Sequence, residues 1–174
     1  MRYSLDSMVR LKYRLAYLMS RAWWFVRRPA TYSTGVALWY TDKILLVRTS
    51  SRSALSLPGG FVKPGEMSDK TARRKLLNGL GVDLSAGGLW LVWHKTLRFE
   101  SRLDTMDIWE MCVESPPRTW FDGRKIIWAG WMAPSEAMKT RLLPPVALYI
   151  LRKNAGLVTD GSSGPRHTAE LAMK

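Results

Sequence analysis

Acidic residues are scarce in this chain of 174 residues. It carries 14 Asp and Glu against 27 Lys and Arg, which gives a formal net charge of +13. Such an excess points to an anionic partner: nucleic acid, acidic lipid, a phosphorylated ligand or an acidic protein. It carries no information about the fold. The length fits one domain of ordinary size with enough apolar residues to form a core.

Cysteine and histidine are also rare. The single cysteine, Cys112, excludes an internal disulfide and is typical of a reducing compartment. We expect it to pack as a small apolar residue. One Cys and two His residues (His94 and His167) cannot build a zinc site at this spacing. His94 has no partner visible in the sequence and is assigned no role.

Long apolar runs are missing too. No segment reaches the roughly 18 uninterrupted apolar residues that a membrane-spanning helix needs. The longest run near the N-terminus is only Ala22–Val26, and basic residues recur where a secretory signal would have an apolar stretch. We therefore expect a cytoplasmic protein, with peripheral association with a membrane surface as an open alternative.

A basic amphipathic helix is predicted at the N-terminus, in a segment of residues 1–30. Pro29 ends it, and residues 1–28 carry a net charge of +6. Packing of its apolar stripe on the chain's own domain is the favoured expectation, and an anionic membrane or a protein partner are the alternatives. Residues Met8, Leu11, Leu15, Leu18, Met19, Ala22 and Val26 share one face of this helix, Arg10, Arg14 and Arg21 share another, and Lys12 interrupts the apolar side.

A mixed α/β domain is predicted over residues 33–153, followed by a polar, disordered tail over 154–174. The expected strands are 35–40, 44–48, 89–98, 107–114 and 125–132, with a hairpin turn at 41–43. The expected helices are a dozen residues from Ser68, a short one over 134–142, and a last one over 145–153. Ser68 is the predicted N-cap of the first helix and Gly81 its C-terminal cap.

Residues 57–82 carry the most specific motif, LPGGFVKPGEMSDKTARRKLLNGLGV. It resembles the Nudix box, and the spacing of Gly60, Glu66, Arg74 and Gly81 fits that box without an insertion. The likeness extends over about residues 33–153 and includes the late segment 120–137, which contains Trp131. It implies a Nudix-type α/β/α sandwich around a mixed sheet and the chemistry of a diphosphate hydrolase, with Mg²⁺ or Mn²⁺ held by carboxylates. It also implies that Glu66 and Arg74 form a salt bridge that braces the loop.

Three glutamate positions of the resembled box are occupied by Lys75, Asn78 and Gly79. These positions share one helix face. Replacing three anions by one cation and two neutral groups changes the local charge by about four units, which opposes binding of a divalent cation. The resemblance therefore favours a Nudix-fold protein that is non-catalytic, needs no cofactor and binds an anionic, nucleotide-like or phosphorylated ligand. The predicted ligand-binding residues are Lys63, Lys75 and Asn78.

Two other functions stay open. The first is an active hydrolase of a nucleoside-diphosphate-type phosphoanhydride, in which Mg²⁺ or Mn²⁺ is held by Glu66 and a carboxylate from outside the box. The second is an interaction module that acts through the basic helix of residues 1–28. Single-stranded nucleic acid is a less favoured partner, since the strand tryptophans are expected to be core and cleft residues. The outside carboxylates are Glu100, Asp104, Asp107, Glu110 and Asp122, and these tryptophans are Trp90, Trp109, Trp128 and Trp131.

Overall fold

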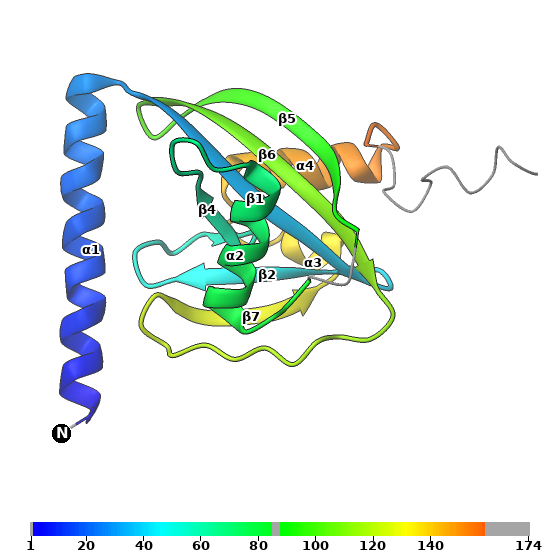
Figure 1. The fold of residues 1–174 in the computed structure, drawn as a ribbon, viewed down its shortest axis with the longest axis horizontal. Helices are drawn as coiled ribbons and strands as arrows, with labels where there is room; N and C mark the ends of the chain where they lie inside the picture. Colours follow the sequence, from blue (N-terminus) through cyan, green and yellow to red (C-terminus); the bar gives the residue numbers. More distant parts are fainter. Residues whose placement is uncertain (1, 85–87, 159–174) are drawn as a thin grey trace, which may run out of the picture.

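The structure is a computed structural model that describes residues 2–84 and 88–158. In chain order the elements are α1 (Arg2–Arg27), β1 (Ala30–Tyr40), β2 (Lys43–Thr49), β3 (Leu55–Ser56), β4 (Gly59–Phe61), α2 (Ser68–Leu80), β5 (Trp90–Phe99), β6 (Arg102–Val113), β7 (Ile126–Met132), α3 (Pro134–Ala137) and α4 (Pro144–Asn154). Figure 1 shows α2 in front of the sheet and α1 standing apart at one side.

A seven-stranded mixed sheet forms the middle layer. Its long central strand, β1, pairs in parallel with β6 over its whole length and antiparallel with β2 and β4. β5 extends the sheet beyond β6, and β7 pairs with β2. The predicted hairpin between β1 and β2 is confirmed, and Thr41 adopts a positive φ of 52° in its turn.

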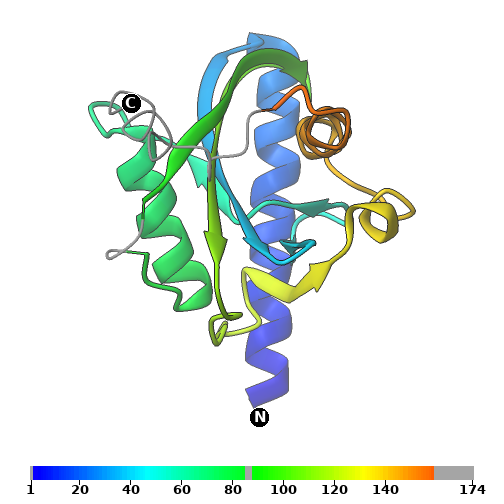
Figure 2. The same cartoon turned by 90° about the vertical axis from the view of Figure 1, so that its right-hand side faces the viewer.

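Alternate residues of β1 and β2 enter two separate cores, because successive side chains of a strand point to opposite faces. Val36, Leu38, Leu45 and Val47 pack beneath α2, against Ala72, Leu76 and Leu80. Ala37, Trp39, Ile44 and Leu46 pack on the other face, against Ala137 of α3 and Tyr149 and Ile150 of α4. Figure 2 shows α2 and the pair α3 and α4 on opposite sides of the sheet. The predicted α/β/α sandwich around a mixed sheet is confirmed.

α2 turns one face to the sheet because Ala72, Leu76 and Leu80 recur every four residues. Its predicted C-terminal cap is confirmed: Gly81 has a φ of 69°, a left-handed conformation that glycine adopts without strain, and its N–H donates to the carbonyl of Leu77. The predicted N-cap is wrong. Ser68 is the first helical residue, and its hydroxyl is not available for capping because it donates to Asp107.

α1 ends at Arg27, before Pro29 as predicted, and Arg28 turns the chain into β1 with a φ of 45°. The favoured expectation for its apolar stripe is wrong. Met8, Leu11, Leu15 and Leu18 are all exposed, and the helix faces the domain with Tyr17 and other polar and aromatic residues. Within the described residues no helix is both long and apolar enough to cross a membrane.

Several boundaries differ from the predictions. The short helix expected over 134–142 covers only Pro134–Ala137, and β3 and β4 were not foreseen. Residues 154–158 were expected to begin a disordered tail, but they are described, and Val158 is buried in the core beside α4. The rest of the predicted tail, residues 159–174, lies outside the described residues.

Candidate functional site

The loop before α2 is tied to that helix by one ion pair. The Arg74 guanidinium donates from Nε to Oε1 of Glu66 at 2.7 Å and from Nη2 to Oε2 at 2.6 Å. These hydrogen bonds hold the pKa of Glu66 at about 2, well below the ordinary 4.5. Both carboxylate oxygens of Glu66 are therefore occupied by its partner, in the geometry expected from the resemblance. The φ of 76° at Gly65 gives the loop its turn immediately before Glu66.

The altered helix face lines a cavity of about 620 Å³ between α1, α2 and the sheet. Lys75, Asn78 and Gly79 all lie on its wall, as do Gly60 and Arg74. The sequence predicted this shared face. The Lys75 stem lies against Gly60, since a Cβ added at Gly60 would be 3.2 Å from Cε of Lys75. A larger residue at position 60 would displace this lysine.

Gly79 lacks room as well as charge. A Cβ at this position would lie 3.0 Å from Cδ1 of Ile126, the first residue of β7. Ile126 is buried and packs in the core beneath α2. A glutamate at position 79 would require Ile126 to move, so this position has neither a carboxylate nor room for one in the present packing.

Positive charge is concentrated at this part of the cavity. Partial burial lowers the pKa of Lys75, and repulsion from Lys125 and Arg74 lowers it further. Within the described residues no carboxylate forms an ion pair with the Lys75 ammonium. Lys125 lies on the cavity wall but was missed from the sequence, because it stands 50 residues after Lys75 at the edge of another strand. An anion between the two ammonium groups would relieve their repulsion.

Lys63, the third predicted ligand-binding residue, lies elsewhere. It lines a neighbouring hollow with Tyr32, Pro64 and Glu66. The structure therefore brings Lys75 and Asn78 together on one wall but leaves Lys63 outside that cavity.

The carboxylates considered for a rebuilt metal site are mostly held by other partners. Glu100 pairs with Arg52 and Arg102, and Asp104 accepts hydrogen bonds from Ser33 and Thr31. Across residues 2–84 and 88–158, no group of three or more His, Cys, Asp or Glu side chains is placed to hold a metal ion. The donor set thus does not fit the divalent cation that the resemblance implies.

The remaining three outside carboxylates are also far from forming one cluster. Asp107 binds His94, Tyr32 and Ser68, and Glu110 is buried with Lys153 and Tyr149. Asp122 lines the cavity, where it accepts a hydrogen bond from the backbone N–H of Arg124.

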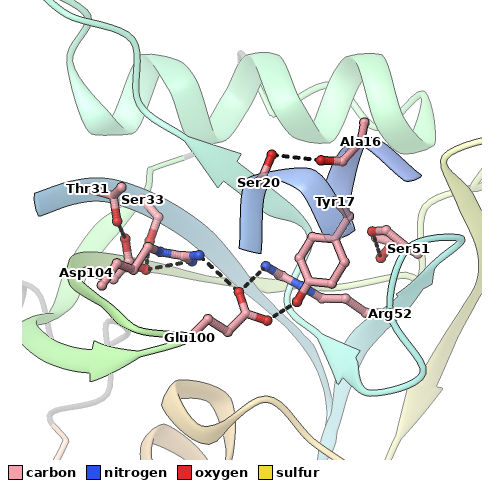
Figure 3. A network of polar contacts seen from close by, with 11 residues as sticks. Ala16, Tyr17, Ser20, Thr31, Ser33, Ser51, Arg52, Glu100 and Asp104 are labelled. Atoms are coloured by element: carbon pink, nitrogen blue, oxygen red, sulfur yellow. Dashed lines mark hydrogen bonds and ion pairs between the residues drawn. The ribbon is translucent and has the colours of Figure 1, made fainter. Parts of the chain in front are cut away.

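α1 covers one side of the cavity through a polar network. The Tyr17 hydroxyl donates to Glu100, and Arg52 donates to the same carboxylate at 2.8 Å. Figure 3 shows Tyr17 and Arg52 converging on Glu100, with Asp104 and Ser33 beside them. Burial raises the pKa of Tyr17 above its ordinary value, so this hydroxyl stays protonated as the donor.

Arg102 anchors the same region from β6. Its side chain is only 3% exposed, and its guanidinium lies 4.1 Å from the ring centroid of Trp24 on α1. It also donates to Glu100 at 3.0 Å. Its Nε is buried and has no hydrogen-bond partner among the described residues. An unsatisfied buried donor is costly.

Three residues outside the cavity, Cys112, Trp90 and His94, differ in the structure from what the sequence predicted. Cys112 is exposed and does not pack as a small apolar core residue. Trp90 is 38% exposed and is not a core residue, although Trp109, Trp128 and Trp131 do pack against the two cores. His94, which was assigned no role, has a partner: Nδ1 lies 2.6 Å from Oδ1 of the buried Asp107. That pairing joins β5 to β6 and is not visible in the sequence.

The fold and the braced loop–helix motif place the chain in a family. The family model for the NUDIX domain matches residues 29–153, so the chain belongs to the NUDIX family. The matched region contains the whole sandwich and leaves α1 outside. A search of curated proteins finds no match.

Solved NUDIX structures share this architecture at low sequence identity. The MutT NUDIX hydrolase from Burkholderia pseudomallei is 16% identical with a TM-score of 0.61, over 70% of this chain and 95% of that one. An Ap4A hydrolase binary complex from C. elegans is 16% identical with a TM-score of 0.61, over 73% and 97%. The NUDIX domain of Shewanella oneidensis NrtR, complexed with ADP ribose, is 16% identical with a TM-score of 0.62, over 74% and 88%. At such identities the likeness shows the fold alone.

Proposed function

We propose that this NUDIX protein is non-catalytic and binds a phosphorylated, nucleotide-like ligand in the cavity between α1, α2 and the sheet. The observation that carries this proposal is Lys75. It stands on the helix face where the resembled motif places a carboxylate, and it shares the cavity wall with Lys125 and Asn78.

The charges support an anionic ligand. Lys75 is partly buried and repelled by Lys125, and both lysines line the cavity. Phosphate oxygens accept strong, charge-assisted hydrogen bonds from ammonium and guanidinium groups. Asn78 adds a neutral amide that can donate to or accept from a ligand. A phosphate group would therefore offset repulsion that the unliganded fold has to sustain.

The dimensions support a ligand of nucleotide size. A cavity of about 620 Å³ falls within the roughly 300–1,000 Å³ typical of small-molecule sites. Trp24, Phe61 and Phe99 line the same cavity and offer apolar surface for the rest of such a ligand. The NrtR domain bound to ADP ribose is a precedent for the fold, not for this chain.

The lack of a metal-binding carboxylate cluster in residues 2–84 and 88–158 supports the absence of catalysis. In metal-dependent hydrolysis, a divalent cation neutralises the diphosphate and activates the attacking water. Here Glu66 is engaged by Arg74, and Lys75 repels a cation from the same face. No contact in the part of the chain that the structure describes favours the hydrolase alternative.

Isothermal titration calorimetry tests ligand binding. Pyrophosphate, ADP and ADP-ribose are titrated into the wild type and into Lys75→Met, Lys125→Met and Lys70→Met. Lys70 is an exposed lysine of the same helix that does not line the cavity, so it is the matched control. Loss of one charge-assisted hydrogen bond costs about 1.5–3 kcal/mol, so we expect the first two variants to bind about 10- to 100-fold more weakly. Unchanged binding of all three compounds to Lys75→Met would refute the proposed site.

A turnover assay tests the absence of catalysis separately. The wild type and Glu66→Gln are incubated with ADP or ADP-ribose and Mg²⁺ or Mn²⁺, and the release of AMP, phosphate and ribose 5-phosphate is measured by chromatography. We expect no release above the rate without protein. Turnover that Glu66→Gln abolishes would overturn the non-catalytic assignment, even if the ligand bound as proposed.

A further inference from the structure

The outward face of α1 is an apolar stripe with none of residues 2–84 and 88–158 packed over it. Met8, Leu11, Leu15, Leu18, Met19 and Val26 make up this stripe, and each is between 51% and 76% exposed. At 100° per residue they fall within an arc about 100° wide. Figure 1 shows α1 as the outermost element on its side of the molecule. A continuous exposed apolar stripe of this kind marks an interaction surface.

The stripe faces outward because the opposite face of α1 is bonded to the domain. Arg10 Nε donates to the carbonyl of Gly123 at 2.8 Å, and Asp6 pairs with Arg124 at 3.2 Å. Further along the helix, Tyr17 binds Glu100 and Trp24 lies on Arg102. On a helical wheel these inward residues lie about 130–170° from the centre of the stripe. Rolling the stripe inward would break all of these contacts.

Cations flank the stripe on both sides. At 100° per residue, Lys12 lies about 20° beyond one edge of the stripe and Arg27 about 80° beyond the same edge, while Arg21 lies about 60° beyond the other edge. All three are exposed, and the Arg27 guanidinium is 5.1 Å from the ring of Trp23. Asp6, the only acidic residue among residues 2–28, faces the domain and is paired there. The charges beside the stripe are therefore all cationic.

This charge pattern distinguishes between the surfaces that could cover the stripe. A second copy packed stripe to stripe would bring the flanking cations of the two copies towards each other, with no acid beside the stripe to pair with them. An anionic bilayer instead offers apolar chains to the stripe and phosphate groups to its borders. Long basic side chains reach from a buried stem to the headgroups, and tryptophan is favoured at that depth.

We infer that α1 binds the surface of anionic membranes, lying flat with the stripe of Met8, Leu11, Leu15, Leu18, Met19 and Val26 inserted at the headgroup boundary. The polar inner face of the helix keeps its contacts with the domain, so the cavity beneath α1 remains formed. This inference concerns a different surface from the proposed ligand site and does not depend on it.

Vesicle co-sedimentation of the full chain tests the inference. The vesicles contain phosphatidylcholine alone or phosphatidylcholine with a quarter phosphatidylglycerol. The test variant carries Leu11→Ser, Leu15→Ser and Leu18→Ser. The matched control carries Leu148→Ser and Leu151→Ser, which replace exposed leucines of α4. A second pair compares Lys12→Glu with Lys139→Glu, since Lys139 is also exposed and lies far from α1 in the sequence.

We expect the wild type and both controls to sediment with the anionic vesicles and to bind phosphatidylcholine alone much more weakly. Removing three leucines from the apolar contact should weaken binding at least about 50-fold, and Lys12→Glu should weaken it in a salt-dependent way. Circular dichroism establishes that the serine variant is folded. Failure of the wild type to bind anionic vesicles, or equal binding by the serine variant, would overturn the inference. A vesicle-independent dimer that the serine variant abolishes would show that a second copy covers the stripe instead.

Discussion

Replacing Lys75 by methionine should stabilise the unliganded protein while weakening its binding of phosphate compounds. Burial and the neighbouring Lys125 lower the pKa of Lys75 on folding. The charged ammonium therefore opposes folding at neutral pH. This cost disappears as the pH rises past the ordinary lysine value of 10.5, where the unfolded chain also loses the proton. Methionine keeps an unbranched stem against Gly60 but removes the charge.

The expected magnitudes follow from these contacts. Removing a like-charge neighbour and a partly buried charge should raise the free energy of unfolding by about 0.5–1 kcal/mol at pH 7. Binding should change in the opposite direction, since one charge-assisted hydrogen bond contributes about 1.5–3 kcal/mol. A residue that serves only packing would affect both quantities in the same direction. A gain in folding stability together with a loss of binding would therefore indicate that Lys75 serves ligand binding and not packing.

Urea denaturation at pH 7 and pH 10.5 measures the first quantity, and calorimetric titration with pyrophosphate measures the second. Lys70→Met, on the exposed side of the same helix, should change neither by more than about 0.5 kcal/mol. The gain in stability of Lys75→Met should shrink at the higher pH. A variant that is less stable than the wild type at pH 7 would show that the ammonium stabilises the fold, which would refute the reasoning.

Three further outcomes are expected. Gly79→Ala should leave the stability of the protein nearly unchanged, because a gain of about 1 kcal/mol in helix propensity is offset by the close contact, at 3.0 Å, between the new Cβ and Cδ1 of Ile126. In an Ile126→Val background, which lacks that Cδ1 atom, the same change should stabilise the protein. Urea denaturation that shows the two substitutions to be additive would contradict this. Glu66→Gln should lower the free energy of unfolding at pH 7, as measured by urea denaturation. Because folding depresses the pKa of Glu66 to about 2, the difference in stability between this variant and the wild type should fade as the pH drops from 4.5 towards 2. A difference that does not change with pH would exclude the ion pair as its cause. Tyr17→Phe removes the hydroxyl that donates to Glu100, so amide hydrogen exchange should accelerate at least about fivefold in α1 and not in α2. If α1 exchanges at the same rate in the variant and the wild type, this hydrogen bond does not hold α1 against the domain.

The α/β/α sandwich and the Glu66–Arg74 ion pair were predicted from the resemblance of residues 57–82 to the Nudix box, with the pattern of strands and helices along the chain as support. Helical spacing alone places Lys75 and Asn78 on one face of α2. Lys125 could not be found in this way. It reaches the cavity because β7 pairs with β2, an arrangement that no local pattern encodes.

The hairpin between β5 and β6 shows a different reason for a missed feature. Its turn consists of Glu100 and Ser101, with positive φ values of 51° and 63° and no glycine or asparagine to signal it. The Glu100 side chain is held there by Tyr17 and Arg52, which come from two distant parts of the chain, and by Arg102 at the start of β6. Tertiary contacts stabilise a turn that local preference would not predict.

The orientation of α1 was missed for a related reason. A helical period identifies an apolar face but not whether the fold covers it. Here Trp24 and Tyr17 on the other face find Arg102, Arg52 and Glu100, so aromatic and ionic contacts fix the helix with the apolar stripe outside. The most hydrophobic face of α1 is therefore not the face that packs on the domain.

The replacements on α2 are chemically coherent as a set. A divalent cation performs two tasks for a diphosphate, neutralising its oxygens and activating a water for attack. The ammonium groups of Lys75 and Lys125 can perform the first task but not the second, because an ammonium donates hydrogen bonds and has no coordination site for water. Loss of the carboxylates alone would leave a diphosphate without positive charge on this face. The lysine supplies that charge, and Glu66 stays with Arg74 to hold the loop. On the proposed function, this exchange retains recognition of the phosphate groups and gives up their hydrolysis.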